Sequence, residues 1–232
     1  MRRSIVGFSL VLAVLAVPLR ASADPAPTEF EPAPAEIHHE PLMAGIAISA
    51  ATILRSGSDP VQWHPVHLQA SPLGQDAFVT VGTGQTDAYG KVSVESPELN
   101  ANTAFRWVFD GDGTYAAAVS QPWTELVEPV VQARVSDRTP RLGQRVVVRG
   151  RMTPARPGKR VSVWTGRRNC WCDMAIAIPA PKRLAAARIH PDGTYRLVIR
   201  FATTGRKLIH VHVARSEGLT FADSYNRHLR VR

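Results

Sequence analysis

The stretch from His190 to Ser224 most limits what this chain can fold into, because it reads as two neighbouring β-strands, each entered through a turn. Residues 194–200 and 208–214 alternate apolar and polar side chains with a period of two. This period places one face of a strand on a core and the other in water. His210 and His212 take the outward phase of the second strand. No long amphipathic run at helical spacing occurs in the sequence, which therefore predicts an all-β protein.

The last part of the chain holds seven such candidate strands, the number that an immunoglobulin-like sandwich requires. They are residues 130–135, 145–152, 160–165, 184–189, 194–200, 208–214 and 227–231. Their inward positions give the predicted core: Val131, Ala133, Val135, Val146, Val148, Val161, Val163, Tyr195, Leu197, Ile199, Ile209, Val211 and Val213. Shorter strands separated by Gly, Pro and Asp run from Ala44 to Glu128, which indicates an antiparallel sandwich there too.

Self-comparison relates the two parts. Residues 105–109 match 209–213, and residues 86–94 match 190–198, in the same order and at an offset of about 105 residues. The sequence therefore predicts two tandem antiparallel immunoglobulin-like β-sandwich domains, a first over 44–128 and a second over 129–232.

The run from Pro154 to Trp164 and the Asp192-Gly-Thr-Tyr195 turn carry a resemblance. They resemble the immunoglobulin-like and prealbumin-like β-sandwich repeats of secreted actinobacterial proteins. Such repeats serve as spacers, adhesion modules and accessory domains, so the resemblance implies a fold without one activity.

The amino-terminal segment predicts export. A basic pair, a short apolar run and Ala21-Ser22-Ala23 form a signal peptide over 1–23, with cleavage after Ala23 and an uncleaved anchor as the alternative. Residues 24–43 are rich in Pro and Glu and predict an extended tether. No later stretch is long and apolar enough to span a bilayer. The expected location is secreted or otherwise extracytoplasmic.

Charge differs sharply between the halves. Residues 24–128 carry three Lys and Arg against fourteen Asp and Glu, and residues 129–232 carry twenty-two against five. A basic half of this kind suggests an anionic partner. The alternatives are that the halves attract each other, or that the genome favours Arg.

Outward positions on the predicted strands of the second domain supply the candidate anion-binding residues. They are Arg134, Arg149, Arg151, Arg160, Arg196 and Arg200. Guanidinium groups at alternate strand positions suit repeated phosphate or carboxylate groups. In an exported protein this predicts an anionic envelope polymer or lipid, or another envelope protein, and no nucleic acid is expected.

Two short motifs suggest other chemistry. Cys170 and Cys172 lie in one connection of an exported chain, where a local disulfide, an intermolecular bond or free thiols, or a metal or redox centre are all open. His210 and His212 share one face of a strand at a spacing that can chelate copper or zinc, with His190, His228 or a cysteine as a third ligand. The alternative is an ordinary polar face.

No recognised catalytic motif occurs in the sequence, so neither an enzyme nor a cofactor is expected. Asp110-Gly-Asp-Gly113 reads as a hairpin turn rather than a calcium loop. The leading hypothesis is a binding or adhesion-type module that acts at the cell envelope through its basic second domain. A structural spacer or accessory subunit is one alternative, and a copper- or thiol-dependent redox protein is the other.

Overall fold

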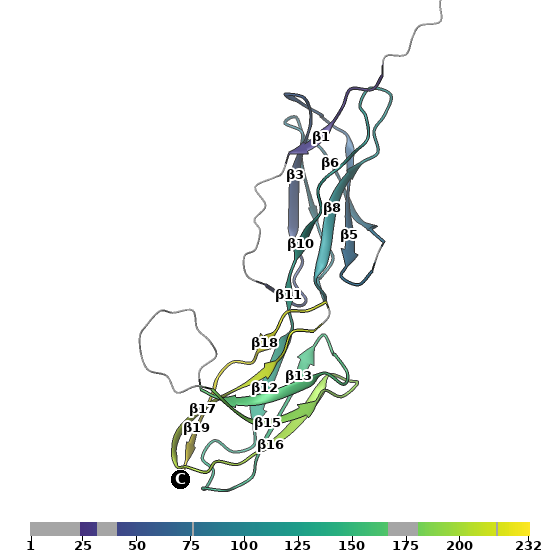
Figure 1. Ribbon diagram of the computed structural model, residues 1–232. Coiled ribbons are helices and arrows are strands. Elements are labelled where there is room, and N and C mark those ends of the chain that lie inside the picture. Colours follow the sequence, from purple (N-terminus) through teal and green to yellow (C-terminus); the bar gives the residue numbers. More distant parts are fainter. Residues whose placement is uncertain (1–23, 32–40, 76, 167–180, 217) are drawn as a thin grey trace, which may run out of the picture.

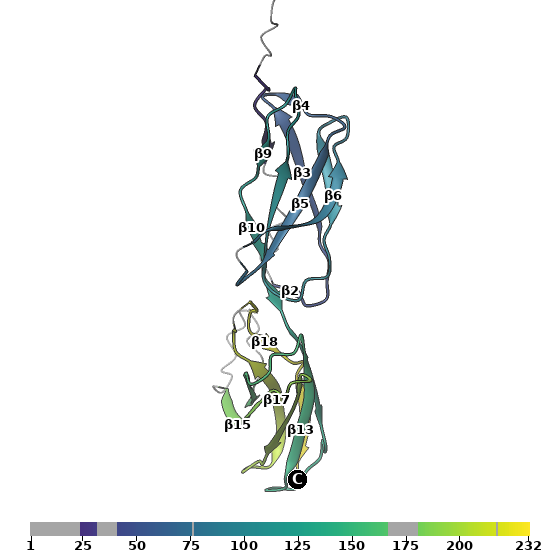
Figure 2. The same ribbon diagram turned by 90° about the vertical axis from the view of Figure 1, so that its right-hand side faces the viewer.

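The computed structural model describes residues 24–31, 41–75, 77–166, 181–216 and 218–232. In these parts of the chain the regular elements are all strands, and they form two β-sandwiches stacked end to end (Figures 1 and 2). This confirms the predicted all-β class with tandem sandwiches. Among the same residues, no helix has the length and apolar character needed to cross a membrane.

The first sandwich consists of two sheets. One holds β1 (Glu29–Glu31), β3 (Ser49–Ser56), β4 (Asp59–Pro60) and β7 (Lys91–Glu95). The other holds β5 (Pro65–Pro72), β6 (Val79–Gln85), β8 (Thr103–Phe109), β9 (Ala118–Val119) and β10 (Trp123–Glu125). A short parallel pair, β2 (Leu42–Met43) and β11 (Val127–Glu128), lies near the second sandwich (Figures 1 and 2). Leu54, Leu68, Phe105 and Trp107 are buried between the sheets.

The second sandwich pairs a three-stranded sheet with a five-stranded one. The first holds β12 (Val130–Val135), β13 (Val146–Thr153) and β16 (Thr194–Ile199). The second holds β14 (Arg160–Thr165), β15 (Lys182–Arg188), β17 (Gly205–Val213), β18 (Ala222–Asp223) and β19 (Arg227–Val231). β15, the fourth strand, pairs with β14 instead of joining the three-stranded sheet. In this it differs from constant-type immunoglobulin domains, whose fourth strand joins the sheet of the first, second and fifth strands.

The predicted core of the second sandwich is observed, because period-two alternation decides which side chains face the opposite sheet. Every predicted core residue is buried except Val135, which is half-buried. One outward residue differs from expectation. His210, expected on a water-facing surface, is only 6% exposed, because Trp164 lies directly beside it on β14 and Asp223 approaches its ring.

The two sandwiches repeat one topology. The order β1-β3-β7 in the first matches β12-β13-β16 in the second, and β6-β5-β8 matches β15-β14-β17. One turn is repeated in detail. Gly90 and Gly193 both have positive φ, and a Cβ on either would lie 2.5 or 2.6 Å from the carbonyl oxygen of Leu54 or Met152, respectively. Only glycine fits this close approach, so both copies conserve the geometry of the turn.

The predicted tether over 24–43 differs from the structure at both ends. β1 pairs with β3, with Phe30 opposite Leu54, and Arg55 forms an ion pair with Glu31. β2 pairs with β11. Proline content predicts an extended chain, and an extended chain can also join a sheet edge. Phe30 accordingly packs against the core.

Hydrogen bonds join the two sandwiches directly. The backbone N–H of Thr220 donates to Val127 O at 3.0 Å, and that of Asn102 donates to Gly218 O at 2.7 Å. The Asn102 side-chain oxygen accepts from the Val127 N–H at 2.7 Å. Val127 and Leu219 are fully buried. A loop of the second sandwich therefore packs against the base of the first, in addition to the covalent connection at Pro129.

Candidate anion-binding site

The outward face of the β12-β13-β16 sheet holds four of the six predicted arginines. Alternation along each strand directs them outward, because Val131, Val148 and Leu197 take the inward phase. We call these four the arginine surface; all are exposed: Arg134, Arg149, Arg151 and Arg196.

Three of these side chains form a row across the sheet. Arg134 pairs with Arg149 in the β12-β13 ladder, and Arg149 pairs with Arg196 in the β13-β16 ladder. Directly opposite residues have α-carbons about 4.5–5.5 Å apart, so the three arginines project from neighbouring backbone positions across the sheet. Like charges in this position destabilise a sheet. No carboxylate of the described residues forms an ion pair with the three.

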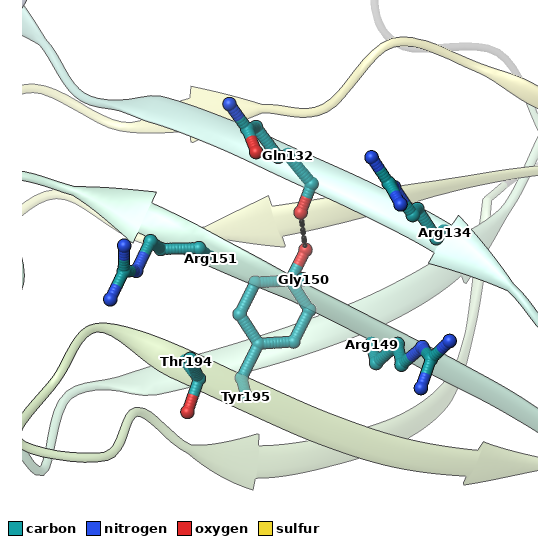
Figure 3. A pocket seen from close by; sticks show the side chains of 7 residues that line it. All are labelled: Gln132, Arg134, Arg149, Gly150, Arg151, Thr194 and Tyr195. Carbon is teal, nitrogen blue, oxygen red and sulfur yellow. Dashed lines mark hydrogen bonds between the residues drawn. The ribbon is translucent and has the colours of Figure 1, made fainter.

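A shallow hollow of about 270 Å³ opens beside this row. Gly150 and Tyr195 line its centre, with Gln132 and Thr194 at its border (Figure 3). The side chains of Arg134 and Arg149 extend to one side of the hollow and that of Arg151 to the other (Figure 3). The space beside Gly150 where a side chain would lie is filled by the Tyr195 ring and the Gln132 carbonyl oxygen. The rim of the hollow is cationic, and the hollow is open to solvent.

Tyr195 fixes the floor of the hollow. Its hydroxyl donates to the Gln132 carbonyl oxygen across Gly150, and a Cβ on Gly150 would lie 2.5 Å from that hydroxyl. Burial raises the pKa of the Tyr195 hydroxyl, so it remains a neutral hydrogen-bond donor. The floor therefore adds no negative charge to a site surrounded by arginines.

The turn before β16 orders one edge of the site. Asp192 accepts hydrogen bonds from the Thr194 side chain at 2.7 Å and backbone at 3.0 Å, and these bonds lower the pKa of its carboxyl group. Arg151 Nε donates to the Asp192 carbonyl oxygen at 3.2 Å. One of the four guanidinium groups is thus anchored, while among the described residues the row of three has no such hydrogen bond.

A second hollow, of about 420 Å³, continues from the same strand. Ala133, Arg134, Val135, Arg138 and Arg227 line it. Arg227 Nε donates to the Ala133 carbonyl oxygen at 2.9 Å. Arg134 belongs to both hollows, so the cationic surface extends beyond β12.

The other two predicted arginines lie elsewhere. Arg160 is on β14, in the opposite sheet, beside Arg188. Arg200 follows β16 and donates to the Gly143 carbonyl oxygen at 2.7 Å. Strand phase alone predicted both as outward, but it could not show on which sheet each would lie.

His210 and His212 are brought together with a residue that sequence reasoning missed. His212 Nδ1 lies 2.9 Å from Asp223 Oδ1, and His210 Nε2 lies 3.8 Å from the same oxygen. Asp223 comes from β18, which pairs with β17 opposite His212. In the described parts of the chain, no three His, Cys, Asp or Glu side chains are arranged to hold a metal ion.

The remaining predicted ligands are not gathered at this cluster. His190 is in the turn before β16. His228 lies on β19, opposite Leu208 of β17. Cys170 and Cys172 lie outside the described residues, so their bonding state stays a prediction.

Comparison with known proteins adds no family. No protein-family model matches the sequence, and no curated protein matches it. The chain is similar to several solved structures at low identity. One is red sea bream transglutaminase, with 11% identity and a TM-score of 0.40, where the match covers 84% of this chain and 30% of that one. Another is the Escherichia coli adhesin FdeC, with 12% identity and a TM-score of 0.34, covering 88% of this chain and 63% of that one. A third is the Yersinia pseudotuberculosis adhesin InvE, with 12% identity and a TM-score of 0.32, covering 88% of this chain and 58% of that one. The chain thus spans less than two thirds of each of these proteins.

Proposed function

We propose that the protein is an exported binding protein of the cell envelope whose arginine surface binds phosphate or carboxylate groups of an anionic polymer or lipid. The row of Arg134, Arg149 and Arg196 carries this proposal. Three directly opposed cations cost folding free energy, and a bound anion would offset that cost. The predicted signal peptide and the resemblance to repeats of secreted actinobacterial proteins support the location.

The geometry suits a repeating ligand better than a small molecule. The α-carbons that carry these arginines repeat about every 4.8 Å across the strands and about every 6.8 Å along β13, from Arg149 to Arg151. Each guanidinium offers several N–H donors that match the oxygens of phosphate or carboxylate. The hollow is too open to enclose a ligand, whereas a chain or a layer of anionic groups can contact many guanidinium groups at once.

Binding of the purified protein to soluble polyphosphate and to vesicles containing phosphatidylglycerol tests the proposal. The first probe stands for a polymer and the second for a lipid surface. Because Debye screening shortens from about 14 Å at 0.05 M salt to about 4 Å at 0.5 M, affinity for the preferred probe should fall steeply over that range. An affinity that does not change with salt concentration, or no binding to either probe, would contradict the proposal.

A triple variant locates the site. Arg134→Gln/Arg149→Gln/Arg196→Gln removes the row, and at about 1 kcal/mol per cation the affinity should fall somewhat more than about 100-fold. The control Arg160→Gln/Arg183→Gln/Arg188→Gln removes the same charge from β14 and β15. A general electrostatic effect would weaken the binding of both variants to the probe equally. That result would contradict the assignment of the site to this face.

The spacer alternative rests on the end-to-end arrangement of the sandwiches (Figure 1). The opposite charges of the two halves predict that such a spacer is held together by attraction between them. The contacts described at the junction are instead neutral hydrogen bonds among Asn102, Val127, Gly218 and Thr220. A spacer would therefore be stabilised by backbone pairing, and its length would not respond to salt.

A further inference from the structure

Three connecting segments leave the first sandwich at the end farthest from the second. They span residues 57–64, which include the two-residue strand β4, and residues 86–90 and 110–117. They meet because Pro65 at the start of β5 pairs with Gln85 at the end of β6, and His67 pairs with Val108 near the end of β8. We call these three segments the loop end; it lies at the top of Figures 1 and 2. Variable immunoglobulin domains bind their ligands with loops gathered in this way.

An exposed tryptophan is fixed at the loop end. Trp63 is 61% exposed, and its φ of 61° is the one positive value at a non-glycine residue in the described parts of the chain. Its N–H donates to Thr86 O at 3.1 Å, and its carbonyl oxygen accepts from Gln85 Nε2 at 3.0 Å. Such backbone strain persists only where surrounding contacts impose it, and it clusters at functional positions.

His64 locks the neighbouring backbone. Its Nδ1 lies 2.5 Å from the Gln62 carbonyl oxygen, and its Nε2 lies 2.9 Å from Asp112 Oδ2. The rings of Phe109 and Tyr115 meet it edge-on at 5.8 and 5.3 Å. Backbone N–H groups of Tyr115 and Thr114 bond Asp112 Oδ1 and lower the pKa of its carboxyl group. The loop carrying Trp63 is thus pre-organised, which reduces the entropic cost of binding.

The loop end is acidic as well as aromatic. Tyr89, 77% exposed, stands on the second loop. Arg55 is paired with Glu31, and Lys91 begins β7. The carboxylates on the three loops outnumber these cations: Asp59, Asp87, Asp110 and Asp112.

The opposite end of the molecule is strongly basic. The β12-β13 connection, the start of β17 and the end of β19 all lie there, since Gly205 pairs with Val231 and Val146 with Ile199. We call its exposed cations the base surface: Arg138, Arg141, Arg145, Arg200, Arg206 and Arg230. Asp137 is the carboxylate on this connection, and it bonds Thr139 and Gln144.

We infer that the loop end docks on the base surface of a second copy of this chain. Acidic and basic ends lie at opposite extremes of an elongated molecule (Figure 1), so they meet only between molecules. Arginine stacks favourably on an exposed indole, and Trp and Arg are the side chains that dominate binding energy at interfaces. Different patches meet in this contact, so it is heterologous and extends head to tail. This inference uses neither the row of Arg134, Arg149 and Arg196 nor the hollow over Gly150; the base surface shares only Arg138 with the second hollow.

Sedimentation velocity on the purified protein at 25 and 300 mM NaCl tests the inference. At 25 mM the wild type should form oligomers that grow with concentration, and at 300 mM it should be monomeric. Trp63→Gly removes the ring while glycine keeps the positive φ. It should weaken association at least about 30-fold, the loss expected for an interface hot spot. Arg138→Glu/Arg141→Glu/Arg206→Glu should abolish association.

Mixing the two variants gives the sharpest readout. Each has one intact patch, so each alone should stay monomeric, while an equimolar mixture should form a complex that stops at one to one. A monomeric wild type at 25 mM, or a mixture that fails to associate, overturns the inference. Tyr225→Ala removes an aromatic ring of the second sandwich that is even more exposed than Trp63, and it should leave association unchanged. A loss equal to that of Trp63→Gly would also overturn the inference.

The anion-binding proposal is tested separately by the same proteins. Trp63→Gly should bind polyphosphate as the wild type does, and Arg134→Gln/Arg149→Gln/Arg196→Gln should still self-associate. If the latter variant loses self-association, the docking surface is the arginine surface and the assignment to the base surface is wrong.

Discussion

Arg149 is flanked on both sides by another arginine, and replacing it should stabilise the fold. Arg149→Gln removes two directly opposed like-charge pairs, those with Arg134 and Arg196. Each such pair costs about 0.2–1 kcal/mol, so the free energy of unfolding should rise by about 0.4–2 kcal/mol. For a sandwich of this size, a gain of about 1 kcal/mol raises the melting temperature by roughly 4 °C.

Urea unfolding in 20 mM and 1 M NaCl is the assay. The gain should be largest at low salt and small at 1 M, where the Debye length is about 3 Å. Arg151→Gln is the matched control, because its neighbours across the sheet are Gln132 and Thr194, both uncharged. Equal effects of the two substitutions, or a gain that persists undiminished at 1 M salt, would refute repulsion in the row.

Two further substitutions test packing. Gly150→Ala should destabilise the second sandwich by at least about 1–3 kcal/mol in urea unfolding, because the new Cβ would overlap the Gln132 carbonyl oxygen and the Tyr195 hydroxyl. Gly113→Ala, with open space around it, should be near neutral, and equal losses of stability would contradict the reasoning. Asn102→Ala leaves the buried N–H of Val127 without its acceptor and should cost about 1–3 kcal/mol. If Asn102→Ala lowers the free energy of unfolding no more than Asn100→Ala does at an exposed position, the hydrogen bond between Asn102 and Val127 contributes no stability.

The fold followed from the sequence because alternation is a local signal. Ile209, Val211 and Val213 face the core for the same reason that Val146 and Val148 do, and each strand shows this by itself. The segment at Glu29–Glu31 was missed because its partner, β3, lies more than twenty residues further along the chain. Proline-rich composition predicts an extended chain but does not reveal whether a sheet edge accepts it.

The candidate site could be predicted only in part. Strand phase placed Arg134, Arg149 and Arg196 outward, but register is what aligns them in one row, and register depends on pairing between distant strands. The same limit applies to His212, whose partner Asp223 follows eleven residues later on a two-residue strand. The positive φ of Trp63 could not be predicted from the residues next to it, because the hydrogen bonds that impose this conformation come from Gln85 and Thr86, between β6 and β7.

The hydrogen-bonded junction has a consequence for any assembly of this protein. Bonds from Asn102 and Thr220 reach across it in addition to the chain connection at Pro129, so rotation of one sandwich about the long axis of the other would break them. The angle between the loop end and the arginine row is therefore the same in every copy. In a head-to-tail filament, each added molecule would turn the row by one constant step, and the rows would trace a regular helix of positive charge along the fibre.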